Sequence, residues 1–249
     1  YLKDGDRWVA LGATRRDPTQ ASFSTEIAGG IRREMRDVIV NLPTYAGIRK
    51  LFIGLEETAH VEAPTPFTAE EPVVWYGTSI TQGGCCSHPG NHYPAMISRA
   101  LDVDFINLGF SGGCRAEAET GDYIAGLDMS VFVYDYDHNA PSVEHLRQTH
   151  HRLYRQVRDR HPQLPIIMIS AADHCFEDHA QRGQVIRESY EQALAEGDGR
   201  VWFLDGSEIY SEVGMDYCLV DVAHPNDLGF WCMYRAILPF VKRALGLQA

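Results

Sequence analysis

From residue 73 onward, short apolar runs alternate with longer stretches in which apolar residues recur at helical spacing. The apolar runs are typical of strands that are buried on both faces of a parallel sheet. We predict five such strands, at residues 73–76, 103–108, 131–134, 165–169 and 201–204. We predict helices at residues 93–101, from Ser142 as N-cap, at 180–196 and from about 228 to 245. This alternation predicts an α/β fold with a doubly wound, five-stranded parallel sheet and right-handed crossovers.

The first 70 residues have a different pattern, with short apolar segments of strand type. The strand candidates are residues 7–12, 21–27, 38–43 and 48–55, and the last two flank a turn sequence, which predicts a hairpin. We therefore predict a small β-rich accessory module at 1–70 that packs on the following domain, with further strands missing upstream. Three prolines and three acids in residues 62–72 predict the linker to a second domain at 71–249.

Charge and composition narrow the class of protein. The 249 residues include 34 acids and 22 bases, for a net charge of −12, which argues against nucleic acid or an anionic membrane as a partner. No apolar run approaches the roughly 18 residues that span a bilayer. The six cysteines show no Cys-x-x-Cys spacing, which argues against a zinc knuckle. A bridge from Cys85 or Cys86 to Cys114 and unpaired thiols both stay open.

Two local motifs suggest nucleophilic chemistry. Ser79 follows the first predicted strand through Gly77, at the strand end where open α/β sheets bind their ligands. Asp221 precedes His224 by three residues on a turn held by Pro225, so its carboxylate can reach Nδ1 of the ring. Nε2 is then free to accept the proton of a serine hydroxyl. The order Ser79, Asp221, His224 predicts a catalytic triad.

Four segments together resemble the SGNH (GDSL-type) hydrolases over residues 73–249. They are Gly77-Thr78-Ser79, Gly109-Phe110-Ser111-Gly112, Asp137-His138-Asn139 and Asp221-x-x-His224-Pro225. The resemblance implies a three-layer, flavodoxin-like sandwich, with Ser79 as nucleophile, His224 as general base and then acid, and Asp221 as its orienting partner. It also implies an oxyanion hole made by the backbone N–H groups of Ser79 and Gly112 and the side-chain amide of Asn139. The β-rich segment resembles the N-terminal module of some bacterial members.

Three residues depart from the family pattern. Thr78 stands where the family usually has Asp, Asp137 replaces a Gly, and Ala140 replaces a second Asp. A threonine hydroxyl can make only part of the hydrogen bonds of the usual Asp. The alternatives that Gly112 serves only a turn and that Asn139 serves only as a cap remain open.

The loop at residues 88–93 lies next to the serine turn, and its polar, compact side chains are expected to wall the substrate pocket. We take His88, His92, His138 and His174 as candidate pocket residues. Polar walls suit a small acyl group on a sugar, so we predict a serine esterase for short-chain (acetyl) esters of carbohydrates that needs no cofactor or metal. Because the chain begins at Tyr1, we expect a trimmed start, and the compartment stays open between the bacterial cytoplasm and a secreted or periplasmic location.

Three other functions are considered beside this one. A lipase or thioesterase would act on longer acyl chains through the same triad. A metal-dependent hydrolase could use carboxylates and imidazoles on the loops after the third and fourth strands, although no His-Glu-x-x-His spacing occurs. Its candidate ligands are Asp135, Asp137, His138, Asp173, His174, Asp178 and His179. A non-catalytic carbohydrate-binding module is favoured by the β-rich segment and opposed by the intact triad.

Overall fold

The computed structural model describes residues 1–14, 17 and 19–247 of the chain. Backbone contacts divide the protein into two units, Tyr1–Pro66 and Phe67–Ala249. The second unit carries all the residues of the predicted triad and oxyanion hole.

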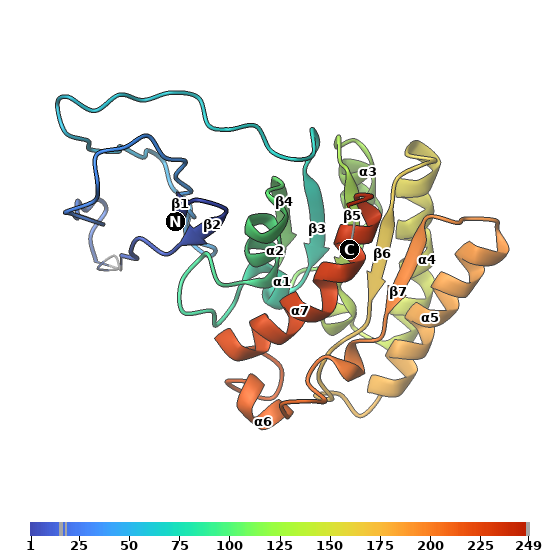
Figure 1. Cartoon of the computed structure of the whole chain (residues 1–249). Helices are drawn as coiled ribbons and strands as arrows, with labels where there is room; N and C mark the ends of the chain where they lie inside the picture. Colours follow the sequence, from blue (N-terminus) through green and yellow to red (C-terminus); the bar gives the residue numbers. More distant parts are fainter. Residues whose placement is uncertain (15–16, 18, 248–249) are drawn as a thin grey trace. The chain divides into compact units, whose positions relative to one another are not determined.

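A five-stranded, fully parallel sheet forms the centre of the second unit, in the order β4-β3-β5-β6-β7 (Figure 1). The strands are β3 (Val73–Gly77), β4 (Phe105–Gly109), β5 (Val131–Asp135), β6 (Ile166–Ile169) and β7 (Val201–Leu204). The sheet grows from β3 to one side through β4 and to the other side through β5. The topological switch point therefore lies between β3 and β5, where sheets of this kind bind ligands. The predicted doubly wound parallel sheet is confirmed.

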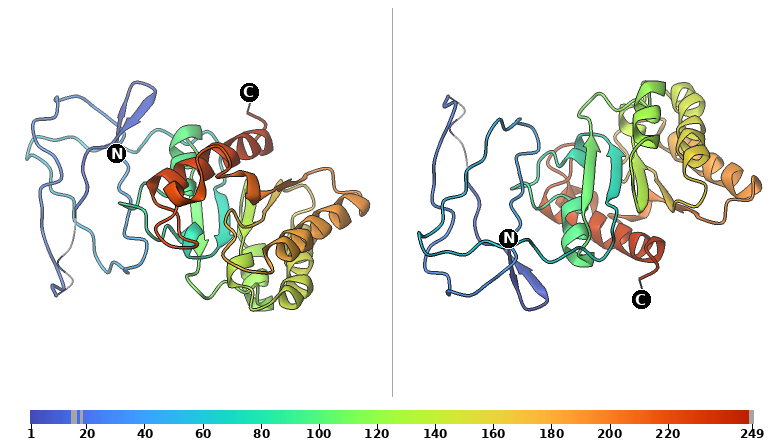
Figure 2. Two further views of the ribbon diagram at one scale, coloured as in Figure 1. Left: turned by 90° about the horizontal axis from the view of Figure 1, so that it is seen from below. Right: turned by 90° about the horizontal axis from the view of Figure 1, so that it is seen from above.

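Helices cover both faces of the sheet and complete a three-layer sandwich (Figure 2). One face packs against α2 (Tyr93–Leu101) and α7 (Asp227–Ala244), and the other against α3 (Ala118–Ala125), α4 (Val143–Arg160) and α5 (His179–Ala195). The shorter elements are α1 (Ser79–Gln82), α6 (Met215–Cys218), η1 (Asp137–Asn139) and η2 (Gly206–Glu208). The predicted helices agree with α2, α4, α5 and α7 to within a residue or two, whereas α3 and the short elements were not predicted.

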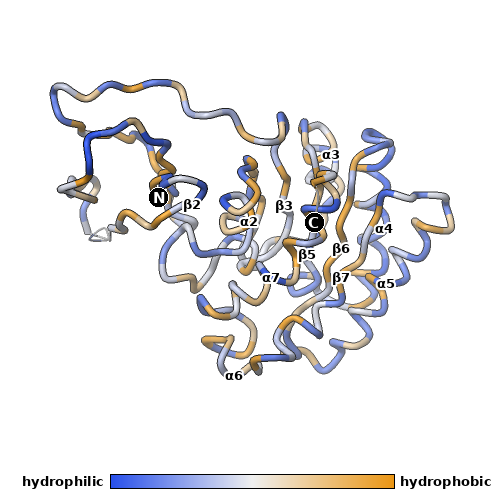
Figure 3. Tube along the Cα trace, viewed as in Figure 1, coloured by the Kyte–Doolittle hydropathy of each residue, from blue (hydrophilic) through white to orange (hydrophobic). Residues whose placement is uncertain are grey.

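The apolar character of the strands explains why the sheet is the core. All five residues of β3 and of β5 are buried, as are all four of β6, whose tube is orange in Figure 3. Successive side chains point to opposite faces, so Val74 and Phe132 join the cluster under α4 while Trp75 and Val133 join the cluster under α7. Burial on both faces is what the uninterrupted apolar runs predict.

The N-terminal unit contains much less regular structure than the sequence predicts. β1 (Leu2–Asp4) and β2 (Arg7–Val9) form an antiparallel pair, and Leu2 makes an isolated bridge to Val38. The predicted strands at 21–27 and 48–55, and with them the hairpin, are wrong: these residues form no strand. The physical reason is the lack of a covering layer, since the apolar side chains of Phe52, Ile53 and others nearby are exposed, and an isolated two-stranded hairpin is marginal in water.

All six cysteines lie among the described residues, and all six are free thiols. Cys114 is fully buried and Cys85 is exposed, so the structure does not contain the bridge between them that the sequence left open. Among the helices that the structure describes, none has the length and apolar content needed to cross a membrane.

Candidate active site

The candidate nucleophile is the first residue of a one-turn helix that follows β3 directly. Thr78, in an extended conformation, is the N-cap of α1, and its Oγ1 accepts a hydrogen bond from the Ile80 backbone N–H at 3.2 Å. Gly83 ends the helix in the left-handed conformation, with φ of 99°. The threonine that replaces the usual Asp therefore still braces the turn through one side-chain bond to the backbone.

A buried hydrogen-bond network fixes this turn to the neighbouring strand. The Asp135 carboxylate, at the end of β5, accepts hydrogen bonds from the Thr81 hydroxyl and, at 2.8 Å, from the Tyr93 hydroxyl. A Cβ on Gly77 would lie 1.9 Å from Asp135 Oδ1, so only glycine fits between the nucleophile turn and this carboxylate. Burial raises the pKa of Asp135 to about 7. Sequence reasoning considered Asp135 only as a metal ligand and missed this role.

The structure brings Ser79, His224 and Asp221 into one hydrogen-bonded chain. Ser79 Oγ lies 2.8 Å from His224 Nε2, and His224 Nδ1 lies 2.8 Å from Asp221 Oδ2. The other carboxylate oxygen of Asp221 accepts the backbone N–H groups of His224 and Ala223. These bonds lower the pKa of Asp221 to about 2, so the carboxylate stays charged and holds the ring with Nε2 facing the serine.

The chain on both sides of His224 fixes the position of its ring. Val220 N–H donates to the His224 carbonyl at 2.9 Å, which closes the loop that carries Asp221. Asn226 is the N-cap of α7, with its Oδ1 accepting from the Leu228 and Gly229 backbone. His224, the candidate base, therefore lies just before a long, well-packed helix.

Two further groups offer free N–H donors on the loops after the adjacent strands. Gly112 follows β4 with φ of +69°, and among the described residues its backbone N–H has no protein partner. Asn139 ends η1, directly after β5, and its Oδ1 accepts the Cys114 N–H at 3.3 Å. Within the described part of the chain its amide nitrogen has no partner, so both N–H bonds are available to a ligand.

The Asp that departs from the family pattern anchors this second loop. Asp137 is buried, and its Oδ2 accepts the Ala171 backbone N–H at 2.8 Å. The Arg182 guanidinium donates to the carbonyl oxygens of Asp137 and Ala140 at 2.7 and 3.0 Å. These contacts tie η1 to β6 and α5, and sequence reasoning predicted neither of them because the partners are far apart in the chain.

The four candidate pocket histidines lie in different surroundings. His92 is buried, caps α2 through Nδ1, and has a pKa lowered to about 4 because burial disfavours its charged form. His138 Nε2 pairs with Asp173 Oδ2 at 2.6 Å. His88 is half-buried beside Ser87, and His174 is exposed, with its ring 4.3 Å from that of His179. Interior packing removes His92 from our candidate site.

A surface cleft of about 510 Å³ lies at the ends of β3 and β4, on the loop that carries Gly112. Its lining combines the polar side chains of Gln82, Ser111, Glu117 and Thr120 with the rings of Tyr76 and Phe110 and with Gly109 and Gly113. None of the triad residues lines it, but Gln82 belongs to α1, which begins at Ser79. No local sequence pattern indicates this cleft, because the β4–α3 loop and α1 form it together.

Comparison with known proteins places the chain in a family. The sequence model of the GDSL-like lipase/acylhydrolase family matches residues 70–242. A GDSL-like lipase from Bacteroides ovatus is similar in structure, with 30% sequence identity and a TM-score of 0.69 over 78% of this chain and 59% of that chain. A search of curated protein sequences finds no match.

Two more distant structures share the fold. Salicylyl-acyltransferase SsfX3 of a tetracycline biosynthetic pathway has 22% identity and a TM-score of 0.62 over 72% of this chain and 56% of that chain. A family two carbohydrate esterase from Clostridium thermocellum, in complex with cellohexaose, has 17% identity and a TM-score of 0.58 over 75% of this chain and 67% of that chain. The chain thus spans 59% and 56% of the Bacteroides lipase and the acyltransferase. The family match and the 30% identity together show that the chain belongs to the GDSL-like lipase/acylhydrolase family, as the four sequence segments predicted.

Proposed function

We propose that the protein is a serine esterase that hydrolyses carboxylic esters through Ser79, His224 and Asp221. The observation that carries this proposal is the unbroken chain from Ser79 Oγ through the His224 ring to the Asp221 carboxylate, with both links at 2.8 Å. His224 takes the serine proton as Oγ attacks the ester carbonyl, and returns it to the departing alcohol oxygen. Water then attacks the acyl-serine. His224 takes a proton from this water and passes it to Ser79 Oγ as the carboxylic acid leaves.

The oxyanion of each tetrahedral intermediate is bound by the backbone N–H groups of Ser79 and Gly112 and by the Asn139 amide. The N–H groups of Gly112 and Asn139 that have no partner in the described protein support this assignment. They come from loops after β4 and β5, the two strands that flank β3, so they are held in place before the charge develops, and preorganised donors of this kind are the most effective.

The proposed substrates are short-chain esters, acetyl esters above all, of carbohydrates. The 510 Å³ cleft offers the polar side chains of Gln82, Ser111, Glu117 and Thr120 beside the rings of Tyr76 and Phe110, and this mixture supports a hydroxyl-rich alcohol group such as a sugar beside the nucleophile turn. The similar structures include a family two carbohydrate esterase and a two-domain esterase active on acetylated mannans. Both are under 25% identical, so they support the fold and motivate the choice of test substrates.

A preference for longer acyl chains is the competing function, and one feature of the surface favours it. Val220, Val222 and Leu228 surround the triad loop and expose 54%, 75% and 41% of their surface. Together with Phe110, which is 44% exposed, they offer apolar contacts to an acyl chain that extends out of the site. The acyl-chain dependence of the rate separates the two functions.

Turnover of p-nitrophenyl acetate, butyrate and octanoate by the purified protein tests the substrate class. We expect kcat/KM to fall by roughly tenfold or more from acetate to octanoate, because a short acyl site gains nothing from additional methylenes that stay in water. The same protein preparation should also release acetate from acetylated xylan and mannan. Octanoate turning over faster than acetate would replace the carbohydrate esterase by a lipase or thioesterase.

A further inference from the structure

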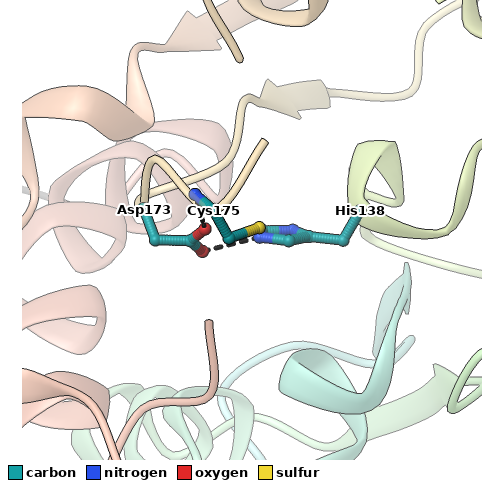
Figure 4. Close-up of side chains that lie close together, drawn as sticks. All are labelled: His138, Asp173 and Cys175. Atoms are coloured by element: carbon teal, nitrogen blue, oxygen red, sulfur yellow. Dashed lines mark hydrogen bonds and ion pairs between the residues drawn. The ribbon is translucent and has the colours of Figure 1, made fainter. Parts of the chain in front are cut away.

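Three side chains with different donor atoms converge beside the loop that carries Asn139 (Figure 4). His138 comes from η1, and Asp173 and Cys175 come from the loop between β6 and α5. Their imidazole nitrogen, carboxylate oxygen and sulfur all lie within 4.8 Å of one another. His138 Nε2 and Asp173 Oδ2 are 2.6 Å apart, and the Cys175 sulfur lies against the ring in Figure 4.

This donor set fits a zinc ion. Zn²⁺ binds imidazole nitrogen and carboxylate oxygen at about 2.0–2.1 Å and thiolate sulfur at about 2.3 Å in a tetrahedral arrangement, which separates the donors by roughly 3.3–3.6 Å. Separating the His138–Asp173 pair by somewhat less than 1 Å, a small rotation of either side chain, would open a site of that size. A thiolate in the set favours Zn²⁺ over Mg²⁺ or Ca²⁺, which prefer oxygen ligands.

Two of the three side chains, His138 and Asp173, are also positioned by contacts with neighbouring groups. His138 Nδ1 lies 3.4 Å from Asp137 Oδ1, so a carboxylate stands behind the ring nitrogen that faces away from the site. Protein zinc sites commonly have this carboxylate–histidine–metal arrangement, which fixes the tautomer of the ligand. Asp173 Oδ1 accepts the Cys175 backbone N–H at 3.0 Å, which sets the loop that carries the other two donors.

The electrostatic surroundings favour a cation. Asp137 and Asp173 are both 1% exposed and lie on opposite sides of the His138 ring. The Arg182 guanidinium, which donates to the Asp137 and Ala140 carbonyls, already pairs with Asp178 at 2.7 Å. The two buried carboxylates beside the single His138 ring therefore favour the binding of an additional positive charge.

We propose that His138, Asp173 and Cys175 form a Zn²⁺ site with an open fourth position for water. Binding releases the thiol proton of Cys175, because the thiolate is the ligand. The ion joins η1, which carries Asn139, to the β6–α5 loop, and its role is structural. None of the three ligands belongs to the proposed triad or oxyanion hole, so metal binding can be tested independently of the proposed esterase.

Cobalt(II), which replaces zinc and reports on thiolate ligands by a near-ultraviolet charge-transfer band, tests the donor set. We expect reduced full-length protein to bind one Co²⁺ with this band, and Zn²⁺ to displace it. Cys175→Ser should abolish the band, whereas Cys85→Ser, which alters an exposed thiol in a different loop, should leave it unchanged. A band that survives Cys175→Ser, or the lack of a band in the wild-type protein, overturns the proposal.

Alkylation of the wild-type protein provides a test that needs no variant. Iodoacetamide labelling of each cysteine is followed by peptide mass spectrometry with and without Zn²⁺. We expect Zn²⁺ to slow labelling of Cys175 roughly tenfold or more and a chelator to restore it, because the bound thiolate is shielded. Labelling of Cys175 at the same rate in both conditions would mean that His138 and Asp173 form an ion pair only.

Discussion

At the scale of single residues, Asn139 is a proposed donor of the oxyanion hole, and it lies between Asp137 and Ala140, which both depart from the family pattern. The side chain is anchored by its oxygen, which accepts the Cys114 N–H, and this orientation directs the amide nitrogen away from that contact. Asp137 and Arg182 then fix the backbone of η1 on the other side. The loop is therefore held by contacts different from those of the usual family pattern, while Asn139 itself keeps a free donor in the described structure.

Replacing this donor should reduce turnover more than binding. We predict that Asn139→Ala lowers kcat about 10²–10³-fold, because the amide bond strengthens only when the carbonyl oxygen becomes charged. KM should change little. The measurement is steady-state hydrolysis of p-nitrophenyl acetate beside the denaturation midpoint of the same preparation.

Asn139→Asp is the matched variant, since it keeps an oxygen that can accept from Cys114 and replaces the donor with a charged acceptor oxygen. It should lose kcat as severely as Asn139→Ala, with a smaller change in midpoint. If both variants keep kcat within a few-fold while the alanine variant loses about 1 kcal/mol of stability, Asn139 acts as a cap. The oxyanion hole would then consist of the two backbone N–H groups.

The hydrogen-bonded chain of Ser79, His224 and Asp221 could be predicted because its signals are local in the sequence. Asp221 and His224 are three residues apart, and Ser79 stands at the end of an obvious strand. The bonds of Asp135 with Thr81 and Tyr93 join residues 54 and 42 positions apart, and no spacing rule connects them. His92 was misjudged for the same reason, since its burial depends on the packing of α2.

At the scale of elements, the link between β3, α1 and β5 positions Ser79, the proposed nucleophile. Asp135 supplies the acceptor that both α1 and α2 use, through the Thr81 and Tyr93 hydroxyls. Its carboxyl group is buried, and burial raises its pKa from an ordinary 3.8 to about 7. The hydrogen bonds that join α1 and α2 to Asp135 at the end of β5 should therefore change with pH near neutrality.

This shift predicts how stability changes with pH. Between pH 4 and pH 7 the folded protein holds a proton on Asp135 that the unfolded chain has lost, so its contribution to stability falls as pH rises and levels off above pH 7. Asp135→Asn removes this dependence. We predict that the stability of wild type minus that of Asp135→Asn falls by on the order of 1 kcal/mol per pH unit across that window.

Urea denaturation at several pH values measures the difference. Asp128→Asn, which removes the same charge from the exposed surface, is the control and should show no such slope against wild type. A flat difference for Asp135→Asn would mean that Asp135 is ionised in the folded protein throughout the window, with its two hydroxyl donors outweighing burial.

The elements of the second unit could be predicted well and those of the first could not, for one physical reason. Buried parallel strands and amphipathic helices have hydrophobic patterns that match the faces covered by neighbouring layers, as in β5 and α4. Residues 21–27 and 48–55 have strand-like composition, but strands form only when a partner strand and a covering layer are present. The described first unit offers neither to these residues.

At the scale of the whole molecule, the proposed chemistry lies within one of the two units. Ser79, His224, Gly112 and Asn139 all belong to Phe67–Ala249, which also contains both apolar clusters around the sheet. The boundary at residues 66 and 67 lies within the linker predicted at 62–72. We propose that the second unit is an independent domain.

A fragment of residues 67–249 should fold and hydrolyse p-nitrophenyl acetate with kcat/KM within about threefold of the full chain. The fragment retains residues 67–72, since Thr68 N–H donates to the Asp102 carbonyl at 2.7 Å. Circular dichroism and a cooperative melt report folding. A fragment that folds and loses activity would assign the first unit a direct part in the site.

The most direct test of the central claim is the ratio of kcat/KM for p-nitrophenyl acetate between the wild-type protein and Ser79→Ala. We predict a loss on the order of 10⁴-fold or more, with the circular dichroism spectrum and melting midpoint unchanged, because the variant removes one hydroxyl at a site that is 9% exposed. A fluorophosphonate should label the wild-type protein once, on Ser79, and leave the variant unlabelled. A folded Ser79→Ala protein that retains about a tenth of the activity would contradict the account, because the hydroxyl would then not be the nucleophile.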